Sequence, residues 1–176
     1  MILAGDIGGT NTRLAIVERD DSGRLRIVVE STFPSTQYEV FHLIVREFLG
    51  RQQSRPEAAC FGVAGPVHAN RCKTMNLSWI VDGAELAADS NIPHVAVIND
   101  LEANGYGISC LEAQDLDVIN AGDPNASGHG AVVSPGTGLG EAGLFWDGQR
   151  YIPIPTEGGH TDYGPRTPLE YELGQY

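Results

Sequence analysis

The stretch ILAGDIGGTNTRLAIV, residues 2–17, decides the fold. The apolar run Ile2 to Gly5 predicts a first strand, and Leu14 to Val17 predicts a second, buried strand. The pair Gly8-Gly9 therefore lies in a hairpin turn between two strands. Two adjacent glycines let backbone N–H groups turn toward a bound anion, and Thr10 adds a hydroxyl donor. We expect a phosphate cradle at this turn.

Two better-known phosphate-binding patterns do not fit this segment. The sequence contains no GxxxxGK[ST] run, and a dinucleotide-binding fold needs a helix where a strand is expected here. Asp6, just before the glycines, suits a magnesium ion held through water. The alternative is a plain glycine hairpin without a ligand, and the motif alone does not decide between the two.

Composition favours a globular protein and argues against nucleic acid. Hydrophobic residues make up 41% of the 176 residues, enough to bury the core of one or two compact units. The 23 acidic and 11 basic side chains give a formal net charge of -12, which repels a phosphate backbone. We therefore expect no nucleic-acid partner and no anionic membrane surface as a partner.

The cysteines and the apolar runs bear on the compartment. Cys60, Cys72 and Cys110 form no CxxC pair and are odd in number, so we expect reduced, mostly buried thiols rather than disulfides or a zinc site. No apolar run approaches the ~20 residues of a membrane helix. The run Ile2 to Ala4 has no basic region before it and is expected to be a strand, not a signal peptide. A cytoplasmic location follows by elimination.

The pattern downstream predicts an α/β unit. Its expected elements are a third strand from Leu25 to Phe33, a helix from Tyr38 to Leu49, a strand from Ala59 to Ala64, a polar irregular stretch from Asn70 to Trp79, a short helix opened by Asp82 and Glu85, a strand from Val95 to Ile98 and a weak helix from Leu101 to Ile108. The first three strands form an opening β-meander.

The polar stretch Asn120 to Gly128 predicts a domain boundary, giving domains 1–120 and 121–176. Beyond it the opening pattern repeats, with strands from Gly130 to Val133, Gly143 to Trp146 and Arg150 to Ile154. The repetition favours an internal duplication with a ligand clamped between the halves. The second part contains no long amphipathic helix to cover its sheet, so either another chain covers it, as in a homodimer, or it belongs to a longer gene product.

Four side chains outside the first hairpin are candidates for chemistry. Asn99 and Asp100 end a buried strand just before a helix, where open α/β sheets place ligands. Asp100 either caps that helix or accepts the proton of an attacking hydroxyl that Asn99 holds. Glu157 and His160 offer an acceptor and a donor on a glycine-rich loop, which suits vicinal sugar hydroxyls, although a solvated surface turn fits equally well.

A second glycine turn, Pro135-Gly136-Thr137-Gly138-Leu139-Gly140, is ambiguous alone. Paired with the first hairpin, it could hold the phosphates of one nucleotide from the opposite side. Taken together, LAGDIGGTNTRLA, VAGPV, NLSW, INDLEAN, PGTGLG and EGGHTDYGPR occur in the order found in bacterial glucokinases. The resemblance runs from Ile2 to about Pro165.

This resemblance implies an actin-like, ribonuclease H-like ATPase fold with a mixed sheet and an incomplete second α/β domain. It implies Mg²⁺-dependent transfer of phosphate from ATP to the 6-hydroxyl of glucose, giving glucose 6-phosphate and ADP. The implied roles are a first phosphate loop of Asp6, Gly8, Gly9, Thr10 and Asn11, with Asp6 at the metal; a second loop including Thr137 and Gly138; glucose ligands Asn99, Asp100, Glu157 and His160; and Asp100 as the base.

Family members continue well beyond the position of Tyr176, so the resemblance implies a portion of the enzyme. Two other readings stay open. One is a sugar-binding module without kinase activity, against which the two retained glycine turns argue. The other is an actin-fold ATPase acting on proteins, which would not call for Asn99, Asp100, Glu157 and His160 together.

Overall fold

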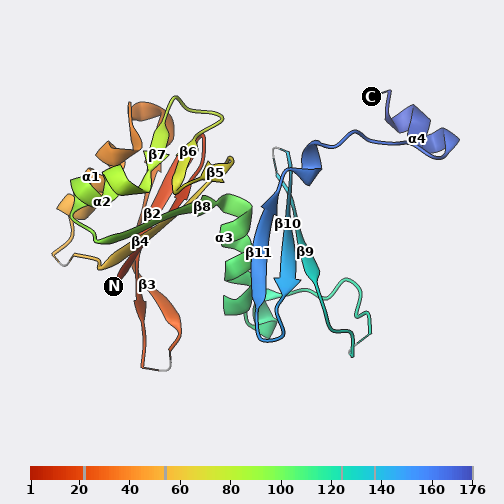
Figure 1. The fold of residues 1–176 in the computed structure, drawn as a ribbon, viewed down its shortest axis with the longest axis horizontal. Coiled ribbons are helices and arrows are strands. Elements are labelled where there is room, and N and C mark those ends of the chain that lie inside the picture. Colours follow the sequence, from red (N-terminus) through yellow and green to blue (C-terminus); the bar gives the residue numbers. More distant parts are fainter. Residues whose placement is uncertain (22, 54, 124, 137, 176) are drawn as a thin grey trace.

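The computed structural model describes residues 1–21, 23–53, 55–123, 125–136 and 138–175. Its main sheet has five strands in the order β3-β2-β1-β4-β8. These strands are β1 Ile2–Ile7, β2 Asn11–Arg19, β3 Leu25–Pro34, β4 Ala58–Val63 and β8 His94–Asn99. The first three form the expected antiparallel meander, and β4 and β8 join it in parallel with β1. The sheet is therefore mixed (Figure 1).

The register of the three parallel strands sets the position of the site. Ile7 of β1 pairs with Val63 of β4, and Val63 pairs with Asn99 of β8. The three strands therefore end level with one another, at the same edge of the sheet. Gly8 and Asp100, which follow immediately, come to that edge although they are far apart in the chain.

Two helices bury one face of this sheet. Helix α1, Phe41–Gly50, places Phe41, Ile44, Val45 and Phe48 in the core, and α2, Gly83–Ser90, adds Leu86. The ring of Phe41 lies edge-on to that of Phe61 in β4, with 5.0 Å between the centroids. Figure 1 shows both helices on the same side of the sheet. Burial of these aromatic and aliphatic side chains supplies the main stabilisation of this lobe.

The start of α1 differs from the expected one. Tyr38 is extended and follows a 3₁₀ turn, Ser35–Gln37, so the helix begins at Phe41. The backbone carbonyl of Tyr38 accepts a hydrogen bond from the indole of the buried Trp79, at 3.1 Å. In a helix that began at Tyr38, this carbonyl would instead accept a hydrogen bond from an amide of the next turn. By contrast, α2 begins as expected, because the Asp82 carboxylate accepts from the amides of Ala84 and Glu85.

The stretch expected to be irregular forms a small antiparallel sheet. It contains β5 Val67–His68, β6 Arg71–Lys73 and β7 Ile80–Asp82 in that order. Asn70, in the turn between β5 and β6, has a positive φ of 61°. Its side-chain amide donates to the carbonyl of Val95 and accepts from the amide of Val97, at 2.9 and 2.7 Å. One side chain thus pairs with the outer edge of β8.

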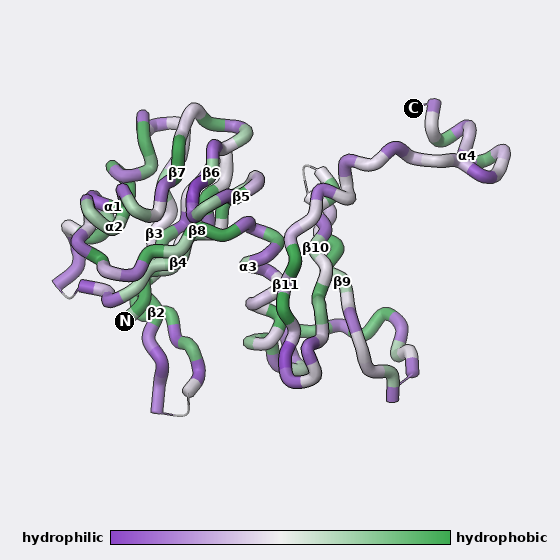
Figure 2. The backbone as a smooth tube through the Cα atoms, viewed as in Figure 1, coloured by the Kyte–Doolittle hydropathy of each residue, from purple (hydrophilic) through white to green (hydrophobic). Residues whose placement is uncertain are grey.

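The second lobe is a three-stranded antiparallel meander, β11-β10-β9. Its strands are β9 Gly130–Pro135, β10 Leu139–Trp146 and β11 Tyr151–Thr156. Figure 2 shows apolar stretches along β10 and β11. Helix α3, Asp100–Gly107, packs on one face, with Gly105 against Pro153 and Leu144. Side chains on the sheet remain exposed, among them Val133, Phe145 and Ile154.

Helix α3 connects the two lobes. The sequence assigned it to the first domain, yet it contacts β9, β10 and β11 as well as β4 and β8. Figure 1 shows it between the five-stranded sheet and the second meander. On the first lobe, Gly62 of β4 admits Ala103 of the helix, since a Cβ at Gly62 would stand 3.2 Å from that side chain. The stretch Asn120 to Gly128, which the sequence predicts as a domain boundary, lies between α3 and β9, while α3 contacts both sheets.

The remaining elements are short. They are the 3₁₀ turns Ile108–Cys110, Ala113–Asp115 and Gly158–His160, and helix α4, Pro168–Leu173, which lies away from both lobes in Figure 1. Within the described residues no helix has the length and apolar character needed to cross a bilayer.

Candidate active site

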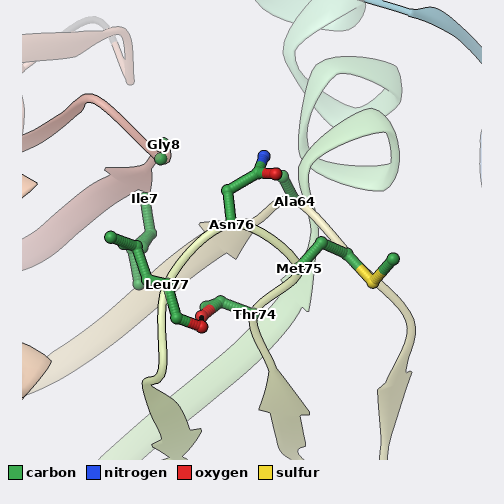
Figure 3. Close-up of a pocket in the computed structure, with 8 residues that line it drawn as sticks. Ile7, Gly8, Ala64, Thr74, Met75, Asn76 and Leu77 are labelled. Carbon is green, nitrogen blue, oxygen red and sulfur yellow. Dashed lines mark hydrogen bonds between the residues drawn. The ribbon is translucent and has the colours of Figure 1, made fainter.

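The glycine hairpin between β1 and β2 is closed by its own backbone. The amide of Gly8 donates to the carbonyl of Asn11 at 3.1 Å. The amide of Gly9 and the hydroxyl of Thr10 have no hydrogen-bond partner among the described residues, so both are free to donate to a ligand. A small pocket of about 10 Å³ lies beside Gly8. Figure 3 shows Gly8 with Ala64 and Asn76, which also line this pocket.

Asp6 is the next-to-last residue of β1, close to the hairpin turn, and it is exposed to solvent. Its neighbours across the sheet are Arg13 in β2 and Gly62 in β4. Within the described ranges no group of three or more His, Cys, Asp or Glu side chains could hold a metal ion. A magnesium ion that shares one carboxylate with phosphate oxygens and water does not need such a group. Asp6 therefore fits that kind of site.

Asn99 is the N-cap of α3. Its Oδ1 accepts from the amides of Leu101 and Glu102, at 2.9 and 3.2 Å, and its Nδ2 donates to the carbonyl of Gly65 at 3.1 Å. The residue is only 6% exposed. An amide nitrogen carries two hydrogens, so one N–H remains for a ligand after these bonds are made. Asn99 thus fixes the helix and keeps a single donor.

Asp100 is the first residue of α3. Its Oδ1 accepts from the amide of Leu101 at 3.0 Å. Burial raises the pKa of this carboxyl above its ordinary value, although hydrogen bonds from the backbone of Leu101 and Asp100 lower it. The charges of Asp6 and Glu157 raise the pKa further. The carboxylate of Asp100, at the start of α3, therefore interacts electrostatically with Asp6 beside the first hairpin and with Glu157 of the second lobe.

Glu157 and His160 lie beyond the end of β11, on opposite sides of two glycines. Oε2 of Glu157 is 3.4 Å from Nδ1 of His160, and both side chains are mostly exposed. Gly159 lies against β10, because a Cβ there would overlap the carbonyl oxygen of Leu139. This contact holds the loop against the start of β10, beside the second glycine turn.

A cavity of about 190 Å³ lies where the lobes meet. It is lined by Pro66 and by Val67 at the start of β5, by Asn99 and Glu102 at the N-terminus of α3, and by Pro155 and Thr156 of β11 with Glu157 just after it. The cavity thus brings together Asn99 and Glu157, two of the four residues expected to bind a sugar. Asp100, the third, follows Asn99 directly, while His160 contacts Glu157 from outside the lining.

Comparison with known proteins identifies the family that shares this arrangement. The family model for glucokinase matches residues 3–176. The chain belongs to the glucokinase family. A glucokinase of Nostoc punctiforme is 41% identical over 177 residues, covering 100% of this chain and 52% of the relative. One from Mesorhizobium japonicum is 36% identical over 174 residues, covering 98% of this chain and 50% of the relative.

Solved glucokinases share the fold. The crystal structure of a glucokinase from an Antarctic psychrotroph matches with a TM-score of 0.84 and 33% identity, covering 99% of this chain and 55% of that one. A glucokinase from Balamuthia mandrillaris in complex with glucose matches with a TM-score of 0.68 and 24% identity, over 99% of this chain and 53% of that one. The expected actin-like ATPase fold is confirmed. The chain spans about half the length of the curated relatives it matches.

The second glycine turn of this glucokinase-family chain is described in part. Gly136 donates its amide to the carbonyl of Gly138 at 2.8 Å, closing the turn between β9 and β10. Thr137, expected to belong to a second phosphate loop, lies outside the described residues. Gly138 is exposed, and a Cβ there would meet nothing within 4 Å.

Sequence reasoning missed several residues around the site. Ser35 and Thr12 are fully buried behind the first hairpin, Asn76 packs on Gly9, and Glu102 lines the cavity. Ser35 and Asn76 are distant in sequence from the glycines they contact, and neither belongs to a pattern with a chemical meaning. Glu102 lies inside the INDLEAN motif, and its position two residues after Asp100 was the one available signal.

Proposed function

We propose that this chain is the part of a glucokinase that aligns the 6-hydroxyl of glucose with the terminal phosphate of ATP, yielding glucose 6-phosphate and ADP. The observation that carries the proposal is the position of Asp100. It stands at the strand edge shared with the glycine hairpin, half-buried, and the charges of Asp6 and Glu157 both reach it. Family membership and the resemblance of the site motifs support the same reaction.

Asp100 is the proposed general base. A carboxylate with a raised pKa holds a proton more tightly, so it accepts the proton of the 6-hydroxyl more readily once it is ionised. Phosphoryl transfer demands mainly alignment and charge stabilisation, so the base acts late and adds to a rate set chiefly by positioning. Asp100 is the first residue of a helix that packs on both sheets, and this position suits that demand.

The sugar contacts follow from the remaining free groups. Asn99 offers its second Nδ2 hydrogen to a sugar hydroxyl, because its other polar positions are occupied by the helix cap and Gly65. Glu157 accepts and His160 donates to a pair of neighbouring hydroxyls. These two side chains contact each other at 3.4 Å, so the sugar would replace an exposed polar contact worth little in water.

ATP and magnesium fit the opposite side of the same edge. The free amide of Gly9 and the hydroxyl of Thr10 would hold phosphate oxygens, with Asn11 beside them, and Thr137 and Gly138 are proposed to face them from the second turn. Asp6 would hold magnesium through water, where the ion offsets charge on the phosphates. The formal net charge of -12 disfavours a polyanion such as ATP. The hairpin donors and the magnesium ion are therefore the groups that would have to hold the phosphates.

The test is glucose 6-phosphate formation from glucose and Mg-ATP, measured for the 176-residue chain and for the complete gene product. Asp100→Asn should lower turnover by about 10²- to 10⁴-fold. Its affinity for glucose should change much less, since an amide can still bind a hydroxyl. Asp117→Asn is the matched control, because Asp117 is exposed and away from the cavity lining, and it should keep full turnover.

The results of this test distinguish the proposed kinase from a sugar-binding module. Unchanged turnover in Asp100→Asn would refute the role of base. Glucose binding without glucose-dependent ATP consumption by the complete product would refute the kinase and favour a sugar-binding module. Activity confined to the complete product would show that residues outside this chain finish the site.

A further inference from the structure

Behind the glycine hairpin, Ser35 and Thr12 form a buried polar pair. Both residues are 0% exposed, and their hydroxyl oxygens are 2.9 Å apart. Ser35 also donates its hydroxyl hydrogen to the carbonyl of Gly8 at 2.8 Å. A carbonyl can only accept and a serine hydroxyl has one hydrogen, so that hydrogen is committed to Gly8. Thr12 must therefore be the donor to Ser35, which fixes the direction of the whole chain of bonds.

Ser35 holds the hairpin at two points. Besides the bond to Gly8, its backbone amide donates to the carbonyl of Thr10 at 2.9 Å. Gly8 and Thr10 flank Gly9, whose amide is free for a ligand. Ser35 comes from the turn that follows β3, 27 residues along the chain from Gly8, so its contacts are tertiary. A serine with its side chain and backbone both directed at one hairpin restrains that hairpin from behind.

We propose that Ser35, oriented by Thr12, is a positioning residue for nucleotide binding. It touches no substrate. It holds the carbonyls of Gly8 and Thr10 inward, and this keeps the amide of Gly9 and the hydroxyl of Thr10 facing the phosphate side. The inference rests on the proposed kinase function, in which these groups hold ATP. It adds a requirement for two buried hydroxyls that the loop motif does not contain or predict.

Removing either hydroxyl should loosen the hairpin. In Ser35→Ala the part-buried carbonyl of Gly8 and the buried hydroxyl of Thr12 both lose their partner, so the hairpin must shift or admit water to satisfy them. The affinity for Mg-ATP should fall by about 3- to 10-fold. Thr12→Val keeps the side-chain shape and the bond from Ser35 to Gly8, so its effect should be smaller and of the same sign.

Ser90→Ala is the matched control. Ser90 is a buried serine in α2 whose hydroxyl donates to the carbonyl of Leu86 at 2.6 Å, far in the chain from the hairpin. This variant removes one buried serine bond within a helix and leaves the hairpin untouched, so it shows what the loss of such a bond does through stability alone. A purely structural role for Ser35 predicts that Ser35→Ala, like Ser90→Ala, changes the thermal midpoint of unfolding without changing the nucleotide Kd.

The experiment measures Kd for Mg-ATP and for glucose, and the midpoint of unfolding, in the complete gene product and in four variants: Ser35→Ala, Thr12→Val, Thr12→Ser and Ser90→Ala. We expect Ser35→Ala to raise the nucleotide Kd, leave the glucose Kd within about twofold, and differ from Ser90→Ala in this respect. Thr12→Ser should bind like wild type because it restores the donor. Equal nucleotide Kd in wild type, Ser35→Ala and Thr12→Val would overturn the inference alone. Absence of saturable Mg-ATP binding to wild type would overturn the proposed function and the inference together.

Discussion

Gly105 in α3 lies so close to Pro153 in β11 that a Cβ atom on the glycine would stand 2.7 Å from the Cβ of the proline. The same atom would stand 3.2 Å from Cδ2 of Leu144. A proline ring cannot rotate away as a longer side chain can. Gly105, which weakens α3 as a helix, is thus what allows the helix to lie against the second sheet.

Replacing Gly105 by Ala should lower the free energy of unfolding by about 1 kcal/mol. Overpacking costs about 1–3 kcal/mol and outweighs the roughly 1 kcal/mol that alanine contributes to helix propensity. Gly107 is the matched control in the same helix, since a Cβ there would meet nothing within 4 Å. Gly107→Ala should raise stability by about 0.5–1 kcal/mol in urea unfolding. A shift of the same sign in both variants would contradict the packing argument.

Asn99→Ala should destabilise the protein by about 1–2 kcal/mol, because it removes the cap of α3 and leaves the carbonyl of Gly65 without its donor. Asn99→Ser should recover part of this loss, since a serine hydroxyl can cap the helix but is too short to replace the amide as well. Urea unfolding measures both. If Ala and Ser variants were equally stable, Asn99 would not act as the cap.

Asp100 should make stability fall as pH rises. Its pKa in the folded protein is raised above its ordinary value of 3.8, so the folded state holds the proton more tightly than the unfolded state does. The penalty for ionisation is absent below the unfolded pKa and is fully present above the folded one. Asp100→Asn should therefore gain stability relative to wild type as pH rises through that window. Unfolding midpoints from pH 3 to pH 7 test this, and a constant difference across the range would refute it.

The three cysteines should differ in reactivity. Burial, with the charge of Glu102, raises the pKa of Cys60, and burial, with the charge of Asp100, raises that of Cys72. Cys110 is exposed, so the expectation of mostly buried thiols is wrong for one of the three. At pH 7.5 iodoacetamide should label Cys110 at least tenfold faster than the others, because the thiolate is the nucleophile. Mass spectrometry of the labelled peptides checks the order, and Cys110→Ser should abolish the fast phase.

Local pattern predicted the elements with the clearest periodicity. The β1–β2 hairpin, the strand before Asn99 and the cap at Asp82 follow from neighbouring residues, and the structure contains them. Helix α1 was expected to begin at Tyr38, and its later start depends on Trp79, 41 residues away. Likewise, the glycines in α3 predict a weak helix, although Gly105 makes a close contact with β11 that local sequence cannot show.

The same limit applies to the site. The register of β1, β4 and β8 brings Gly8 and Asp100 to one edge. The sequence predicted only that Asn99 and Asp100 end a buried strand where α/β sheets place ligands, because strand register is not visible in the sequence. It offered helix capping as a role for Asp100, whereas Asn99 caps the helix and Asp100 occupies the first helical position. Which of two adjacent polar residues turns inward depends on backbone angles that a sequence does not record.

The side chain of Asn70 has a consequence for how the protein behaves in a crowded solution. Strand β8 is the last in the main sheet, and its outward backbone groups could recruit a strand from another molecule. Asn70 occupies the carbonyl of Val95 and the amide of Val97, the positions at which such a strand would attach. The carboxamide of Asn70 thus blocks the addition of a strand from another molecule at β8. It protects this sheet edge without placing a charged side chain on it.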